Sequence, residues 1–108
     1  MEVNLAKAEI FAGICGFTTT VETETKDDMT CKVSIKSECA AIQKLAGELT
    51  EVNPYREISF RGKGPTILET GSHYCTHPAC PVPTGIIKAV EVAAGLALPQ
   101  DVTIKISK

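Results

Sequence analysis

Two neighbouring stretches of the chain alternate between core-type and polar residues, and both are rich in β-branched side chains. In residues 17–25 one side of the alternation is Phe17, Thr19, Val21 and Thr23, a two-residue period typical of a half-buried strand. Residues 31–36 alternate in the same way, which places Cys31, Val33 and Ile35 on one face. Residues 26–28 supply a turn between them, so the pattern predicts a β-hairpin with Cys31 facing the core.

Two later stretches show helical spacing. Ser37 is the predicted N-cap of a helix whose apolar face is Ile42, Leu45, Ala46 and Leu49 and which ends before Asn53. Cys39 falls in its first turn. A second helix is predicted from about Pro83 to between residues 95 and 98, mostly apolar with a narrow polar stripe of Lys88 and Glu91. We expect this second helix to be largely buried.

Three shorter elements complete the predicted architecture. Ile58 and Phe60 indicate a short strand, residues 66–69 match a capping box that opens a short helix, and residues 102–106 alternate as a last strand. The one-sided alternation of the strands favours an antiparallel sheet with one wet face. We therefore predict a single α+β domain over residues 1–108, a two-layer sandwich in which a small, mainly antiparallel sheet carries two main helices on one face.

Composition narrows the choice of partners and compartment. The chain has 108 residues, with 11 Lys plus Arg, 13 Asp plus Glu and a formal net charge of −2. It therefore lacks the excess of basic residues that is typical of proteins that bind nucleic acid or an anionic membrane. Residues 1–12 do not match a signal peptide, and residues 89–99, the least polar stretch, are too short for a membrane span. We expect a cytoplasmic protein with no nucleic-acid or membrane partner, and leave a protein partner or a homo-oligomer open.

Five cysteines are an unusually high number for a chain of 108 residues. In a reducing cytoplasm, cysteines at this density are metal ligands, reactive thiols or small buried side chains more often than disulfide partners. The run from His73 to Pro81 is the densest, because His73, Cys75, His77 and Cys80 fall within eight positions just before the predicted second helix. The N-terminus of that helix would favour the thiolate form of Cys80.

The other cysteines divide by position. Cys15 has a glycine on either side, Cys39 lies in the first turn of a predicted helix, and Cys31 is assigned to the core. The remaining four, Cys15, Cys39, Cys75 and Cys80, form a set suited to zinc or an iron–sulfur cluster, with His73 and His77 as further ligands or supporting partners. Their spacing matches neither a zinc finger nor a ferredoxin, and for Cys39 packing explains the position as well as ligation does.

Three strings of the sequence also carry a resemblance. AGICGF at residues 12–17, HYCTHPACPVP at residues 73–83 and IIKAVEVAAGLALPQDVTIKI at residues 86–106 resemble a small single-domain family of anaerobic archaea and bacteria that has no assigned activity. The likeness covers nearly the whole chain. It implies a cytoplasmic, oxygen-sensitive protein and says nothing about a substrate.

These observations leave three functions open. The first is a small metal-binding protein that holds zinc or an iron–sulfur cluster through Cys15, Cys39, Cys75 and Cys80. The second is a metal-free thiol or redox protein in which Cys15 or Cys80 is a nucleophile of low pKa. The third is an interaction module whose cysteines are only packing units. No motif assigns an enzyme class.

Overall fold

A four-stranded antiparallel sheet forms one layer of the molecule, with the strands side by side in chain order. The computed structural model describes residues 4–26 and 28–108, and its strands are β1 (Leu5–Phe11), β2 (Thr18–Thr25), β3 (Cys31–Ser37) and β4 (Glu51–Val52). The predicted hairpin is β2 and β3, which pair with Val21 opposite Ile35 and Thr25 opposite Cys31. β1 and β4 are the two edges of the sheet.

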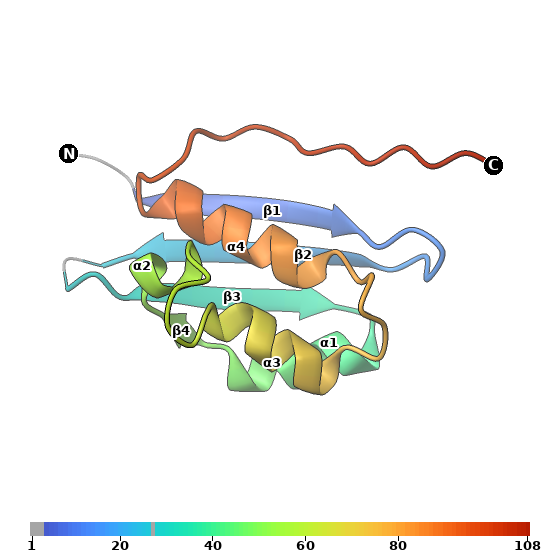
Figure 1. Ribbon diagram of the computed structural model, residues 1–108, viewed down its shortest axis with the longest axis horizontal. Coiled ribbons are helices and arrows are strands. Elements are labelled where there is room, and N and C mark those ends of the chain that lie inside the picture. Colours follow the sequence, from blue (N-terminus) through green and yellow to red (C-terminus); the bar gives the residue numbers. More distant parts are fainter. Residues whose placement is uncertain (1–3, 27) are drawn as a thin grey trace.

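The second layer consists of helices that cover one face of this sheet (Figure 1). They are α1 (Ala40–Glu48), α2 (Pro54–Glu57), α3 (Thr66–Tyr74) and α4 (Val82–Ala93). The long helix α4 crosses β1 and β2, α1 packs against β3, and α3 contacts both α1 and α4. The predicted α+β architecture with helices on one face is confirmed.

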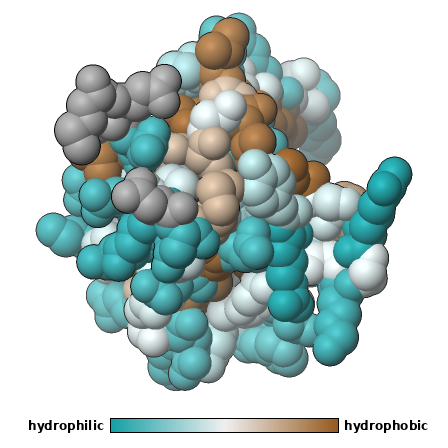
Figure 2. Space-filling view, turned by 90° about the vertical axis from the view of Figure 1, so that its left-hand side faces the viewer, coloured by the Kyte–Doolittle hydropathy of each residue, from teal (hydrophilic) through white to brown (hydrophobic). Residues whose placement is uncertain are grey.

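The core lies between the two layers. Alternate strand residues face the helices, and the fully buried apolar side chains include Val21, Cys31, Leu45, Ile67, Ile86 and Val90. The opposite face of the sheet carries lysines and glutamates, among them Lys7, Glu22 and Lys36, all exposed. On the end of the molecule that Figure 2 shows, apolar atoms reach the surface from the top toward the middle of the view, with polar atoms on both sides.

Two threonines of β2 are buried on the core face because each hydroxyl has a partner. The Thr19 hydroxyl donates to the Ser37 hydroxyl oxygen at 2.9 Å. The Thr23 hydroxyl donates to the carbonyl of Ala89 in α4 at 3.0 Å. Since a buried hydroxyl without a partner destabilises the folded state, these bonds explain how a threonine-rich strand serves as the centre of the core layer.

The helix starts differ from the predicted caps. Cys39, not Ser37, is the N-cap of α1, and the Ser37 hydroxyl accepts the Cys39 N–H at 3.1 Å. Residues 66–69 do not form the expected capping box; Pro65 is the N-cap of α3. The free N–H groups of α3 are instead taken by the buried Glu57 carboxylate, which accepts from Ile67 N at 2.7 Å and from Thr66 N at 3.2 Å.

Two predicted strands are wrong, and β1 and β4 were not anticipated. Ile58 and Phe60 are exposed in the loop after α2, and residues 96–108 form an extended tail outside the sheet. This tail runs beside β1 without pairing to it (Figure 1). Alternation reports that a segment suits a strand, but a strand also needs hydrogen bonds from a neighbour, which the pattern does not supply.

None of the helices in residues 4–26 and 28–108 combines the length and apolar character needed to cross a membrane.

Candidate functional site

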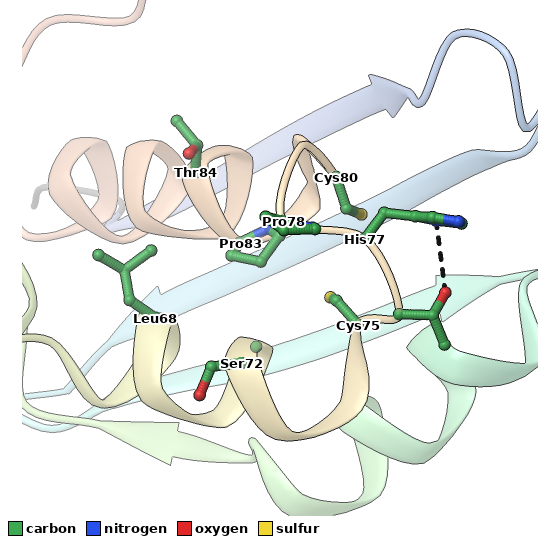
Figure 3. Close-up of a pocket in the computed structure, with 10 residues that line it drawn as sticks. Leu68, Ser72, Cys75, His77, Pro78, Cys80, Pro83 and Thr84 are labelled. Atoms are coloured by element: carbon green, nitrogen blue, oxygen red, sulfur yellow. Dashed lines mark hydrogen bonds between the residues drawn. The ribbon is translucent and has the colours of Figure 1, made fainter.

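The loop between α3 and α4 holds two of the predicted ligand cysteines. Cys75 is the C-cap of α3, and its N–H donates to the Gly71 carbonyl at 2.8 Å. Cys80 immediately precedes Pro81, the N-cap of α4, and its N–H donates to the His77 carbonyl at 3.2 Å. The first bond ends α3 and the second closes a turn within the loop, and the thiols of Cys75 and Cys80 lie near each other between the helix ends (Figure 3).

Cys39 supplies a third thiol from a distant part of the sequence. It is the N-cap of α1, which packs against α3. Burial raises the pKa of the Cys75 thiol to about 11, helped by the neighbouring Cys80 and, to a smaller extent, by Cys39. The start of α1 lies at the same end of the molecule as the α3–α4 loop (Figure 1), and we call Cys39, Cys75 and Cys80 together the thiol cluster.

A hollow of about 510 Å³ opens beside Cys75 and Cys80. Its walls come from α3 and α4, and the side chains that line it include Leu68, Ser72, His77 and Thr84 (Figure 3). The helices are in tight contact there, because a Cβ on Gly71 would lie 2.8 Å from Cγ of Pro83. The hollow gives a solvent molecule or ligand access to two of the three thiols in the cluster.

The two histidines are placed differently. His77 lines the hollow, and its Nδ1 lies 3.4 Å from the Thr76 hydroxyl oxygen. His73 is exposed in the last turn of α3 and does not line the hollow. The structure therefore brings His77, but not His73, to the edge of the thiol cluster.

Cys15 lies in the turn between β1 and β2. The turn is closed by a hydrogen bond of 2.9 Å from Gly16 N to Gly13 O, and both glycines have positive φ, +86° and +77° for Gly13 and Gly16. This backbone conformation explains the glycines. Cys15 is exposed and is not among the groups that act on Cys75, so the structure does not join it to the thiol cluster. Its turn nevertheless lies at the same end of the molecule as the α3–α4 loop and the start of α1 (Figure 1).

Cys31 is separate from all of these residues. It begins β3 at the opposite end of the sheet and is fully buried. Burial raises the pKa of its thiol, an effect that Thr25 and the Glu24 backbone reduce. The prediction that Cys31 is a core residue is confirmed.

The arrangement stops short of a finished mononuclear metal site. In the part of the chain that the structure describes, no three side chains of His, Cys, Asp or Glu are grouped as they would be around one metal ion. The four-cysteine ligand set, with His73 and His77, thus stays a prediction.

Sequence reasoning missed the polar side chains of the hollow, Ser72 and Thr84. A signal was available for Ser72, because Leu68, Ser72 and Cys75 follow helical spacing and therefore share one face of α3. Thr84 has no such signal: it faces the hollow only because the α3–α4 loop reverses the chain.

Comparison with known proteins places the chain in a family. No curated protein matches the sequence. Residues 6–106 match the profile of one family, a span that includes β1 from Ala6 onward, all three loops with candidate ligands and the tail to Ile106. This confirms the resemblance to a small single-domain family without assigned activity. The protein belongs to DUF6951, a family of unknown function.

Proposed function

We propose that this protein binds a thiolate-ligated metal centre, zinc or an iron–sulfur cluster, through the thiol cluster of Cys39, Cys75 and Cys80, with Cys15 as the fourth ligand. One observation carries the proposal. Three cysteines at the starts or ends of three different helices lie at one end of the molecule, while Cys31 is buried at the other end.

The chemistry of these thiols favours a soft metal. Thiolates bind zinc and iron strongly, and a bound cation deprotonates a coordinating thiol. Without a cation, burial and then the neighbouring thiols raise the pKa of Cys75. A bound cation would replace the repulsion between neighbouring thiolates by attraction to a common centre. The cluster is therefore better suited to binding a metal cation than to holding ionised thiols without one.

Cys15 completes the set by its position. Its turn lies at the cluster's end of the molecule, and nothing buries its side chain. A movement of the β1–β2 turn toward α3 and α4 is required for Cys15 to join the other ligands. Zinc and an iron–sulfur cluster both need four sulfur ligands that converge on one centre, so this movement is part of the proposal for either metal centre.

The test is anaerobic purification of the full chain with measurement of bound metal, acid-labile sulfide and visible absorption. We expect either zinc near one equivalent or iron with sulfide and a charge-transfer band, and loss of the metal in Cys39→Ser, Cys75→Ser, Cys80→Ser and Cys15→Ser. His73→Ala is the matched control and should retain the metal, since His73 lies away from the hollow. Trace metal only in the wild type, or full retention in the cysteine variants, contradicts the proposal.

The closeness of Cys75 and Cys80 supports a second candidate, a metal-free dithiol that reduces a disulfide substrate. The Cys80 thiolate would attack one substrate sulfur and release the other as a thiolate. Cys75 would then attack Cys80 in the mixed disulfide, which releases the second substrate thiol and leaves an oxidised Cys75–Cys80 pair. Cys80 takes the attacking role because burial and its neighbours hold the pKa of Cys75 high.

This candidate is tested by incubating the metal-free protein with a model disulfide and identifying the products by mass spectrometry. A Cys75–Cys80 disulfide in the wild type and a trapped mixed disulfide on Cys80 in Cys75→Ser would support it. Equal reaction of exposed Cys15 alone in both proteins would exclude it.

A further inference from the structure

The free edge of the sheet at β1 and the extended C-terminal tail are both suited to pair with a further strand. β1 is the first strand of the sheet and has a neighbour on one side only, β2. Within the tail, residues 102–106 carry the alternation that predicts a strand, yet no backbone hydrogen bond joins residues 97–108 to any other described residue. We propose that two copies of this protein associate by exchanging tails, each tail adding as a strand to β1 of the other copy.

The backbone groups at the β1 edge can be assigned from its pairing with β2. Asn4 and Ala12 are hydrogen-bonded to β2, through Thr25 N to Asn4 O at 2.9 Å and Ala12 N to Phe17 O at 3.0 Å. In an antiparallel pair every second residue takes part in such bonds. The N–H and C=O groups directed at the free edge are therefore those of Leu5, Lys7, Glu9 and Phe11. In the described chain no backbone hydrogen bond reaches these groups.

The tail supplies a matching strand. Val102, Ile104 and Ile106 are 62%, 76% and 90% exposed, although β-branched apolar residues at alternate positions are typical of a strand with one buried face. Thr103, Lys105 and Ser107 form the polar face. Apolar atoms reach the surface at the top of Figure 2, the side on which Figure 1 places the tail. The family match extends to residue 106, so the tail belongs to the domain that the family shares.

Orientation favours a second copy over the tail's own sheet. The tail leaves α4 near the start of β1 and runs in the same direction as β1 (Figure 1), so addition to its own edge would give a parallel pair. Parallel pairing is slightly less stable per residue than antiparallel pairing. Exchange between two copies allows the antiparallel arrangement and covers both free edges at once.

The experiment is analytical ultracentrifugation of the full chain and of two variants that add the same charge to opposite faces of the tail. We expect a dimer for the wild type, a monomer for Ile104→Lys, and a dimer for Thr103→Lys, whose lysine falls on the polar face. Circular dichroism serves as the folding control, because the exposed tail contributes no contact to the core. A monomeric wild type, or a dimer that survives both Ile104→Lys and removal of residues 100–108, overturns the proposal.

Amide hydrogen exchange on the same samples identifies the pairing. Protection of the Leu5, Lys7, Glu9 and Phe11 amides in the dimer, lost in Ile104→Lys, supports tail exchange. Protection of those amides in a monomer would show that the tail docks on its own β1, and this too overturns the proposal. Metal content measured in parallel should not change in Ile104→Lys, so failure of the tail exchange and failure of metal binding are distinguishable.

Discussion

Glu57 shows how one side chain determines the geometry near the site. It is 1% exposed, and both carboxylate oxygens accept backbone N–H groups at the start of α3. A carboxylate at a helix N-terminus also interacts favourably with the helix dipole. Because α3 ends at Cys75, the anchor at one end of this helix helps to fix the thiol at the other.

Replacing this carboxylate should destabilise the fold. We expect Glu57→Ala to lower the free energy of unfolding by about 1–3 kcal/mol, because it leaves buried N–H groups without acceptors. Urea denaturation measures the change. Glu51→Ala removes an exposed carboxylate and is the matched control; an equal loss in both variants would rule out the capping role of Glu57.

The Cys75 thiol predicts how stability depends on pH in the metal-free protein. Its pKa is raised from 9.0 to about 11 by folding, so the folded state disfavours the thiolate. Its contribution to stability is complete below pH 9 and is lost as pH rises toward 11. Cys31, whose pKa is raised by burial, contributes in the same direction.

The measurement is the free energy of unfolding of reduced, metal-free protein at several pH values from 8 to 11. We expect the decrease above pH 9 to be smaller in Cys75→Ala than in the wild type. Cys15→Ala, which removes an exposed thiol, should retain the full wild-type decrease. Identical pH curves for Cys75→Ala and the wild type would contradict the assignment.

At the scale of elements, the contact between α4 and β1 depends on a glycine. A Cβ on Gly85 would lie 2.6 Å from Cγ1 of Ile10, closer than non-bonded carbon atoms approach. Gly85 therefore allows α4 to lie directly on the edge strand. This contact positions the first turns of α4, which follow Cys80.

A methyl group at this position should cost stability. We expect Gly85→Ala to destabilise the protein by about 1–3 kcal/mol, as overpacking typically does, and Ile10→Val in the same chain to restore part of the loss. Thermal denaturation is the measurement. Gly47→Ala, in α1 with open space around it, should be neutral or stabilising by about 0.5–1 kcal/mol; if Gly85→Ala behaves likewise, the close contact is not as described.

The sequence predicted the elements in which the periodicity of apolar residues matches the buried face. It missed or misassigned the segments for which pairing with a neighbouring strand decides the structure. The β2–β3 hairpin, α1 and α4 follow from alternation and helical spacing, and Cys31 follows from the same pattern; α3 was predicted from a capping box that does not form. β1 was missed because its inward residues, Ala6 and Ala8, are small and give weak contrast. The tail was assigned to the sheet because alternation does not indicate whether a partner is present.

The candidate site could be predicted only in part, because the sequence pattern indicates local structure but not which distant residues come together. Loop and helix-start positions singled out Cys39, Cys75 and Cys80, which lie at one end of the molecule; that they bind a metal stays a prediction. The separation of His73 from His77 could not be predicted, since it depends on where α3 ends and how the following loop turns. The anchor from Glu57 to α3 joins residues of two helices across a loop, and no local pattern reports it.

At the scale of the whole molecule, the two regions for which we propose functions do not overlap. The cysteines other than Cys31 lie at one end, around the turns that join β1 to β2 and α3 to α4, whereas the free edge of β1 and the tail lie along one side (Figure 1). Tail exchange would therefore leave the thiol cluster open to solvent. We expect metal binding and dimer formation to be independent properties of the chain.

X-ray absorption spectroscopy at the metal edge, on protein purified without oxygen, tests directly whether the cysteines bind a metal. We expect zinc or iron with a first shell of sulfur at about 2.3 Å, and a reduced sulfur coordination number in Cys15→Ser. A wild-type sample without metal, or a metal coordinated only by nitrogen and oxygen, would contradict the proposal that the thiol cluster and Cys15 form a metal centre.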